Sequence, residues 1–138
     1  MPPSDICEPQ IIRAIEKAGF RLTHKQFAIR PSPNENFVYA DLRFKQDNQV
    51  IIVVEVKCFP IRSAFTEEFY QAVGQYLLYR NSLRLAGIEG DLYLAIPVSA
   101  YEDYILVRPS TQATLTEANI KLIVVDLATE EIIEWKTW

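Results

Sequence analysis

The chain has 138 residues, enough to bury a core, and we expect one domain spanning residues 1–138. Its net charge of −4 argues against a dedicated non-specific nucleic-acid-binding protein, which would usually be basic. The apolar runs are too short to span a bilayer, and the N-terminus lacks the basic start and apolar stretch of a secretory signal. We therefore expect a cytoplasmic protein with no membrane contact.

The first 57 residues predict a helix followed by three strands. Asp5 and Glu8 match an Asp-x-x-Glu capping box at the start of a helix whose apolar residues recur at helical spacing. Three segments rich in apolar and β-branched residues then follow, separated by a loop and a turn. Their sequences are FRLTHKQFAIR (20–30), FVYADLRF (37–44) and VIIVVEVK (50–57). Three consecutive strands in an antiparallel meander is the most economical interpretation.

The second half of the chain predicts a long helix, a strand, further helical segments and two final strands. The long helix is long enough to form a crossover connection, so we expect the third and fourth strands to be parallel. The predicted class is α/β, in the order α-β-β-β-α-β followed by a C-terminal helical segment and two strands. The segments are helix 66–87, strand 91–98, short helix 99–106, helix 111–119, and strands 120–127 and 130–136.

Charged residues interrupt two of the predicted strands. Side chains alternate across a strand, so Glu55 and Lys57 share one face, while the other face of that strand is uniformly apolar and must belong to the core. The same test places Asp41, in the preceding strand, on a face that carries charges. If residues 45–49 form the turn that pairs the two strands, Asp41 lies within reach of Glu55. This arrangement predicts a functional site.

The chemistry of this site depends on what lies between the acids. Two neighbouring carboxylates repel each other and raise the pKa of one of the pair, unless a cation lies between them. Mg²⁺ could be that cation, because it needs only one or two carboxylates besides water and substrate phosphate. Lys57 could position or deprotonate an attacking water, or stabilise charge on a phosphate. The alternative is an acid–base pair that closes the sheet at its rim. The strand pattern alone favours this alternative.

The long helix carries a polar stripe that bears on the same question. At 100° per residue, Gln75 and Tyr79 align, and could hydrogen-bond to the lysine, to water or to a phosphate. The solvated side of an amphipathic helix is the default interpretation of such a stripe. Gly74 lies inside this helix, where we expect it to allow close packing of the backbone against the sheet, with a functional close approach as the alternative.

The two cysteines, Cys7 and Cys58, fall in different predicted elements and lack the spacing of a Cys-x-x-Cys motif. In a reducing cytosol we expect two free thiols rather than a disulfide or a catalytic thiol.

The charged residues and the helix together resemble the PD-(D/E)XK nuclease superfamily. The matching pattern is Asp41, thirteen intervening residues, Glu55-Val56-Lys57, and then a helix with Gln75-x-x-x-Tyr79. The resemblance implies a restriction-endonuclease-like core, with a central mixed sheet flanked by helices. It also implies a metal site for Mg²⁺, with Mn²⁺ as a substitute. The roles implied are metal ligation by Asp41, Glu55 and the Val56 carbonyl, catalysis by Lys57 with Gln75, and additional contributions from Tyr79 and from Glu8 or Glu16.

A denser similarity covers almost the whole chain. The segments DIxxxxIxxAIEKAGF, VVEVKCF, AVGQYLLYR and IKLIVVDxxxEEIIEW are similar to the XisH family, cyanobacterial proteins called fdxN element excision controlling factors. This resemblance implies a role in programmed excision of a DNA element during heterocyst differentiation. The family acts there beside a site-specific recombinase and a second small factor, XisI, so the partners implied are DNA, the recombinase machinery and an XisI-like protein.

Three functions remain open at the level of sequence. The first is an accessory factor for DNA-element excision with a metal-capable acidic site. The second is an active Mg²⁺-dependent endonuclease, and the third is a non-catalytic interaction protein in which Asp41, Glu55 and Lys57 only hold strands together. Retention of all three charged residues favours a working site. The acidic net charge favours action within a complex, either a homo-oligomer or an assembly with a partner.

Overall fold

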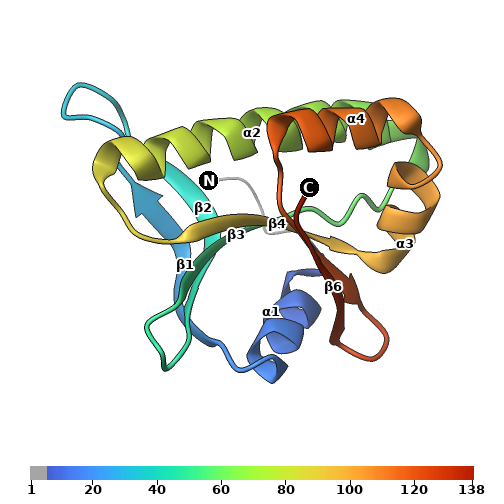
Figure 1. Cartoon of the computed structure of the whole chain (residues 1–138), viewed down its shortest axis with the longest axis horizontal. Coiled ribbons are helices and arrows are strands. Elements are labelled where there is room, and N and C mark those ends of the chain that lie inside the picture. The colour runs from blue at the N-terminus through green and yellow to red at the C-terminus, as the bar shows by residue number, and fades with distance from the viewer. Residues whose placement is uncertain (1–5) are drawn as a thin grey trace.

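A computed structural model describes residues 6–138 and shows a six-stranded mixed sheet with helices on both faces (Figure 1). The strands lie in the order β1-β2-β3-β4-β5-β6, which is also their order along the chain. The strands are β1 (Arg21–Ile29), β2 (Val38–Lys45), β3 (Ile51–Val56), β4 (Asp91–Pro97), β5 (Leu122–Asp126) and β6 (Glu131–Lys136). The helices are α1 (Glu8–Lys17), α2 (Phe65–Ala86), α3 (Val98–Ala100) and α4 (Pro109–Ala118), with short helical turns η1 (Arg62–Ala64) and η2 (Tyr101–Ile105).

The predicted strand connections are confirmed. β1, β2 and β3 form an antiparallel meander, and β3 pairs with β4 in parallel through the crossover helix α2. A parallel pair requires a connection of this length, and the 22 residues of α2 supply it. The helix ends at Gly87, whose φ of 68° gives the left-handed cap that glycine adopts at low cost. The final strand β6 returns antiparallel to β5.

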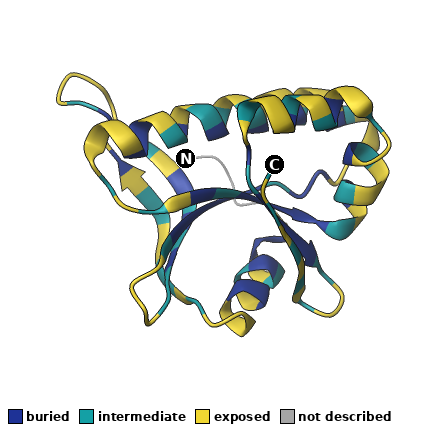
Figure 2. Cartoon of the chain, viewed as in Figure 1, coloured by how far each residue is buried: buried dark blue, intermediate teal, exposed yellow. Residues whose placement is uncertain are grey.

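Helices cover both faces of the sheet, so the central strands are buried on both sides (Figure 2). One core lies between the sheet and α1 and includes Val54 and Val56. The other core lies beneath α2 and α4 and includes Val53 and Tyr76. Only one face of β3 was expected to belong to the core, and this expectation is wrong, because the face that carries Glu55 lies beneath α2. Among residues 6–138, no helix is both long enough and apolar enough to cross a membrane.

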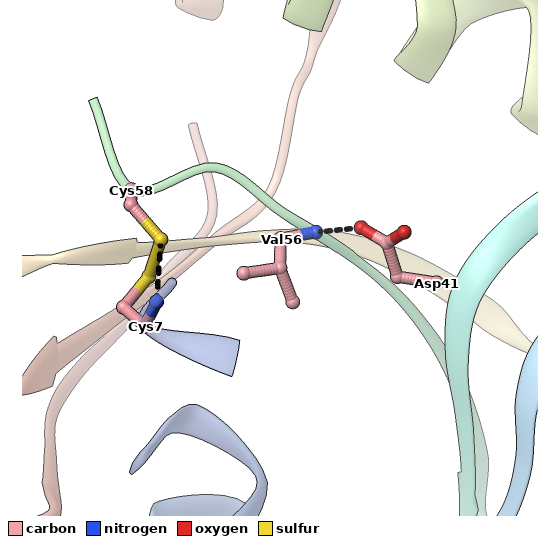
Figure 3. The surroundings of a disulfide bond; sticks show 4 residues. All are labelled: Cys7, Asp41, Val56 and Cys58. Carbon is pink, nitrogen blue, oxygen red and sulfur yellow. Dashed lines mark hydrogen bonds between the residues drawn. A yellow bond between two sulfur atoms is a disulfide. The ribbon is translucent and has the colours of Figure 1, made fainter. Parts of the chain in front are cut away.

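The expectation of free thiols is also wrong, because Cys7 and Cys58 form a disulfide with their Cα atoms 5.9 Å apart (Figure 3). Cys7 is the N-cap residue of α1, and α1 packs against the face of β3 that carries Val56. This packing brings the start of α1 to the residue that follows Lys57. The two cysteines are 51 positions apart, so their spacing gave no sign of the contact. Asp5 of the predicted capping box lies outside the described residues, and the helix begins at Glu8.

The polar stripe predicted on α2 is solvated only in part. Of its members Glu68, Gln71, Gln75, Tyr79 and Ser82, Gln71 is exposed, Glu68 and Gln75 are half-buried, and the other two are buried. Tyr79 and Ser82 are buried and face the sheet, and the hydroxyl of Ser82 donates a hydrogen bond to the Leu78 carbonyl at 2.7 Å. Gly74 does not pack against the sheet either. A Cβ atom added at Gly74 would have nothing within 4 Å, so close packing inside the described chain does not explain this glycine.

Candidate functional site

The candidate site lies where β2 and β3 stop pairing through their backbones. Their register runs from Lys45 opposite Ile51 to Leu42 opposite Val54, which makes Asp41 and Glu55 the next residues in line. Beyond this point, hydrogen bonds between backbone amides and side-chain carboxylates replace the backbone pairing of the two strands. The Val56 amide donates a hydrogen bond to Asp41 Oδ2 at 2.8 Å (Figure 3), and the Asp41 amide donates to Glu55 Oε1 at 3.3 Å.

The direction of the Val56 amide follows from the geometry of β3. Successive backbone N–H groups of a strand point to opposite sides, and the Lys57 amide donates to the Ala95 carbonyl of β4 at 3.0 Å. The Val56 amide therefore points toward β2, where the Asp41 carboxylate meets it. A carbonyl lies on the same side of a strand as the amide of its own residue, which places the Val56 carbonyl toward β2 as well.

Glu55 is the most perturbed acid of the site. The residue is only 4% exposed, and burial, followed by the charge of Asp41, raises the pKa of Glu55 to about 9. Lys57 and the hydrogen bond from the Asp41 amide oppose this rise but do not cancel it. At neutral pH Glu55 is therefore protonated beside an acid that already accepts a backbone hydrogen bond. A cation between the two acids would reverse this preference.

Lys57 lies near the two acids but forms no salt bridge with either of them within residues 6–138. Its charge lowers the pKa of Glu55, which places it near that carboxyl group. Within residues 6–138, its ammonium forms no salt bridge with Asp41 or Glu55 at 4.0 Å or less. The alternative in which Glu55 and Lys57 neutralise each other as an ion pair is therefore not the arrangement observed.

Tyr79 of α2 lies near the two acids, and Gln75 of the same helix carries a second polar group. Burial, with smaller contributions from the charges of Glu55 and Asp41, raises the pKa of Tyr79 to about 12, so the phenol stays protonated at neutral pH. Gln75 lies one helical turn earlier on the same side of α2. Its Oε1 atom is buried and has no hydrogen-bond partner among the described residues. An unpaired buried amide oxygen is costly, and a ligand or an ordered water would satisfy it.

Gln26 is a site neighbour that the sequence did not reveal. The pairing of Lys25 with Leu42 and of Phe27 with Ala40 places Gln26 opposite Asp41. Gln26 has a φ of 51°, a left-handed conformation that is uncommon for residues other than glycine. Glutamine carries no sequence signal for this conformation, whereas glycine or asparagine would. Backbone strain of this kind often accompanies functional sites.

The structure does not bring Glu8 to the two other acids. Glu8 is buried in the first turn of α1, and α1 covers the face of the sheet opposite to Glu55. It is also absent from the charges that shift the pKa of Glu55. Glu16 is an exposed residue of α1 close enough to Arg13 to affect its pKa.

The oxygen atoms of Asp41 and Glu55 fit a hard divalent cation. Within residues 6–138, no three or more His, Cys, Asp and Glu residues are grouped closely enough to hold a metal by themselves. Magnesium does not need such a group, because it retains several waters and binds through one or two carboxylates. The carboxylates of Asp41 and Glu55, the Val56 carbonyl and the unpaired oxygen of Gln75 are all of the hard type that this ion prefers.

Two solved structures resemble this fold over nearly the whole chain. An XisH family protein from Nostoc punctiforme PCC 73102 has 29% identity and a TM-score of 0.83, covering 95% of this chain and 98% of that one. An fdxN element excision controlling factor protein from Anabaena variabilis has 27% identity and a TM-score of 0.84, with 96% and 98% covered. A protein of unknown function from Silicibacter pomeroyi shares the fold at 15% identity and a TM-score of 0.51, covering 100% of this chain and 75% of that one.

The sequence itself matches a protein-family model. No curated protein matches significantly. The family model that does match is described as XisH protein, and it covers residues 1–133. This match agrees with the two structural neighbours that carry family names. The chain therefore belongs to the XisH family.

Proposed function

We propose that this chain is a controlling factor for excision of a DNA element and that it holds Mg²⁺ at a site of PD-(D/E)XK nuclease ancestry. Family membership and the named function of the Anabaena variabilis neighbour support the excision role. The proposal of a metal site rests on the neighbouring carboxyl groups of Asp41 and Glu55. They lie where β2 and β3 separate, and each accepts a hydrogen bond from a backbone amide.

Each residue has a distinct task in this proposal. Asp41 and Glu55 supply the charged ligands, and the Val56 carbonyl and Gln75 Oε1 add neutral oxygen atoms. A bound Mg²⁺ would polarise a phosphate and lower the pKa of a water ligand. Lys57 contributes a positive charge that no salt bridge within the described chain occupies, suited to a developing negative charge on phosphate oxygen.

The acidic composition of the chain limits how it can contact DNA. With a net charge of −4, the chain has little general attraction for DNA, so phosphate contacts would have to pass through the metal and Lys57 or be supplied by a partner. We accordingly place this chain in a complex with an XisI-like protein and the recombinase machinery, as the family resemblance implies.

Calorimetric titration with Mg²⁺ and Mn²⁺ tests the metal site. We expect the wild-type chain to bind either ion, and Asp41→Asn to weaken binding by at least about tenfold. The asparagine side chain would retain an oxygen acceptor for the Val56 amide, so the variant should keep its fold. Asp47→Asn is the matched control, because Asp47 is a fully exposed acid in the β2–β3 turn. Equal binding by the wild type and Asp41→Asn would contradict the proposed ligand set.

An active endonuclease is the second candidate, and the position of Lys57 favours it. The test is Mg²⁺-dependent cleavage of plasmid DNA by the wild type beside Lys57→Ala, with Lys25→Ala as a control at an exposed lysine of β1. Activity lost in Lys57→Ala alone would establish the nuclease. Metal binding without cleavage would support the accessory role. The absence of both metal binding and cleavage would indicate the non-catalytic interaction protein.

A further inference from the structure

The side of α2 that faces away from the sheet exposes three large apolar residues among polar ones. Tyr70, Leu78 and Leu85 are 68%, 50% and 61% exposed. Together with Gly74 they fall within an arc of about 80° on the helix, which also contains the exposed polar residues Glu67 and Asn81, and we call Tyr70, Gly74, Leu78 and Leu85 the outer face. Figure 2 shows this side of α2 mostly exposed. The inner side is apolar too, and a helix that is apolar on both sides is normally buried on both.

Gly74 indicates how closely the outer face can be approached. Glycine is a poor helix former, yet it occupies the interior of a 22-residue helix. An added Cβ would meet nothing within 4 Å, so neither the sheet nor α4 requires a glycine there. What a glycine does provide on a helix surface is a shallow depression into which a side chain of another molecule can fit.

We propose that the outer face is the interface between two copies of this chain, packed with their α2 helices antiparallel and with Leu78 of each copy seated over Gly74 of the other. A two-fold axis requires every contact to occur twice with its residues exchanged. Gly74 and Leu78 are one turn apart, so an antiparallel crossing between them makes both contacts at once. Each depression then receives one apolar side chain.

The charges at the two ends of the outer face favour this orientation. Glu67 lies seven residues before Gly74 and inside the same arc, whereas Arg84 lies six residues after Leu78 and about 40° outside the arc, and both are exposed. Antiparallel packing brings Glu67 of each copy to Arg84 of the other. Parallel packing would instead set Glu67 against Glu67 and Arg84 against Arg84, and like charges held together are unfavourable. A second copy is thus complementary to the outer face in both shape and charge.

This inference goes beyond the proposed metal site and does not depend on it. Tyr79 lies on the side of α2 that faces the sheet, and Gln75 lies about 100° around the helix from Gly74, so the contacts between Gly74 and Leu78 use neither residue. A chain that dimerises without binding Mg²⁺, or that binds Mg²⁺ as a monomer, would separate the two proposals.

Sedimentation equilibrium of the full chain tests the interface. At about 100 μM chain, above the micromolar dissociation constants of modest interfaces, we expect the wild type to have twice the 15.9 kDa mass of one copy. Gly74→Leu and Leu78→Glu should each weaken association by at least about tenfold. Both positions are exposed, so circular dichroism and thermal unfolding should show intact folds. Val107→Glu, at an exposed apolar residue outside α2, is the control and should remain dimeric.

Charge reversal tests the orientation. Glu67→Arg and Arg84→Glu should each weaken the dimer, and the double variant should restore it, because both cross-copy pairs are then rebuilt with exchanged signs. A monomeric wild type, a dimer that survives Gly74→Leu and Leu78→Glu, or a double variant no tighter than the single ones would overturn the proposal.

Discussion

At the scale of single residues, Glu55 has the most strongly shifted pKa of the candidate site. It is a carboxyl group buried beside another carboxyl group, with a pKa raised to about 9 by burial and by the charge of Asp41. Alternation along β3 and the turn before it were enough to predict the proximity of Asp41 and Glu55. The hydrogen bonds from the Val56 amide to Asp41 and from the Asp41 amide to Glu55 were not predictable, because they depend on where the ladder stops, and nothing in the sequence marks that residue.

The raised pKa of Glu55 predicts how stability depends on pH in the absence of metal. Between 4.5, the ordinary pKa of a glutamate, and about 9, the folded chain keeps a proton on Glu55 that the unfolded chain has lost. The free energy of unfolding should therefore fall as pH rises through this window, by up to about 1.4 kcal/mol per pH unit from this group. Urea unfolding at several pH values measures this slope. Glu55→Gln should remove it, and an unchanged slope in that variant would contradict the assignment.

At the scale of elements, most helices and strands follow from local patterns, whereas their docking does not. The meander, the crossover helix and the parallel β3–β4 pair were all predictable from alternation, turn residues and helix length. The side of α2 that carries Phe69, Tyr76 and Leu83 was predictable as the packing side, and these residues are buried. The burial of Tyr79 was not predictable, because its spacing assigned it to the polar stripe beside them. The contact between the start of α1 and the end of β3 was not predictable either, because it joins residues 51 positions apart in the sequence.

The disulfide between Cys7 and Cys58 fixes this contact, and its removal is a test at the same scale. Closing a loop of 51 residues restricts the unfolded chain, by about 4 kcal/mol in the chain-entropy model. We expect Cys58→Ser to lower the free energy of unfolding by a large part of this amount in urea denaturation. A reducing agent should destabilise the wild type similarly and leave the variant unaffected. Equal stability with and without the bond would show that α1 is held by packing alone.

At the scale of the whole molecule, α2 has two surfaces with different proposed roles. The inner surface covers Asp41 and Glu55 through Tyr79, and the outer face offers Tyr70 and Leu78 to a second copy. Family membership was predictable because its sequence motifs extend over most of the chain. The outer face was not predicted, since Gly74 alone is equally compatible with packing inward or outward.

Manganese bound in a crystal tests the metal site at the level of its individual ligand atoms. Anomalous scattering from a crystal soaked in Mn²⁺ should give a peak about 2.1 Å from oxygen atoms of both Asp41 and Glu55. The same soak of Asp41→Asn should give no peak at that position. A wild-type crystal with no peak there, and with Asp41 still bonded to the Val56 amide and Glu55 to the Asp41 amide, would contradict the proposed metal site.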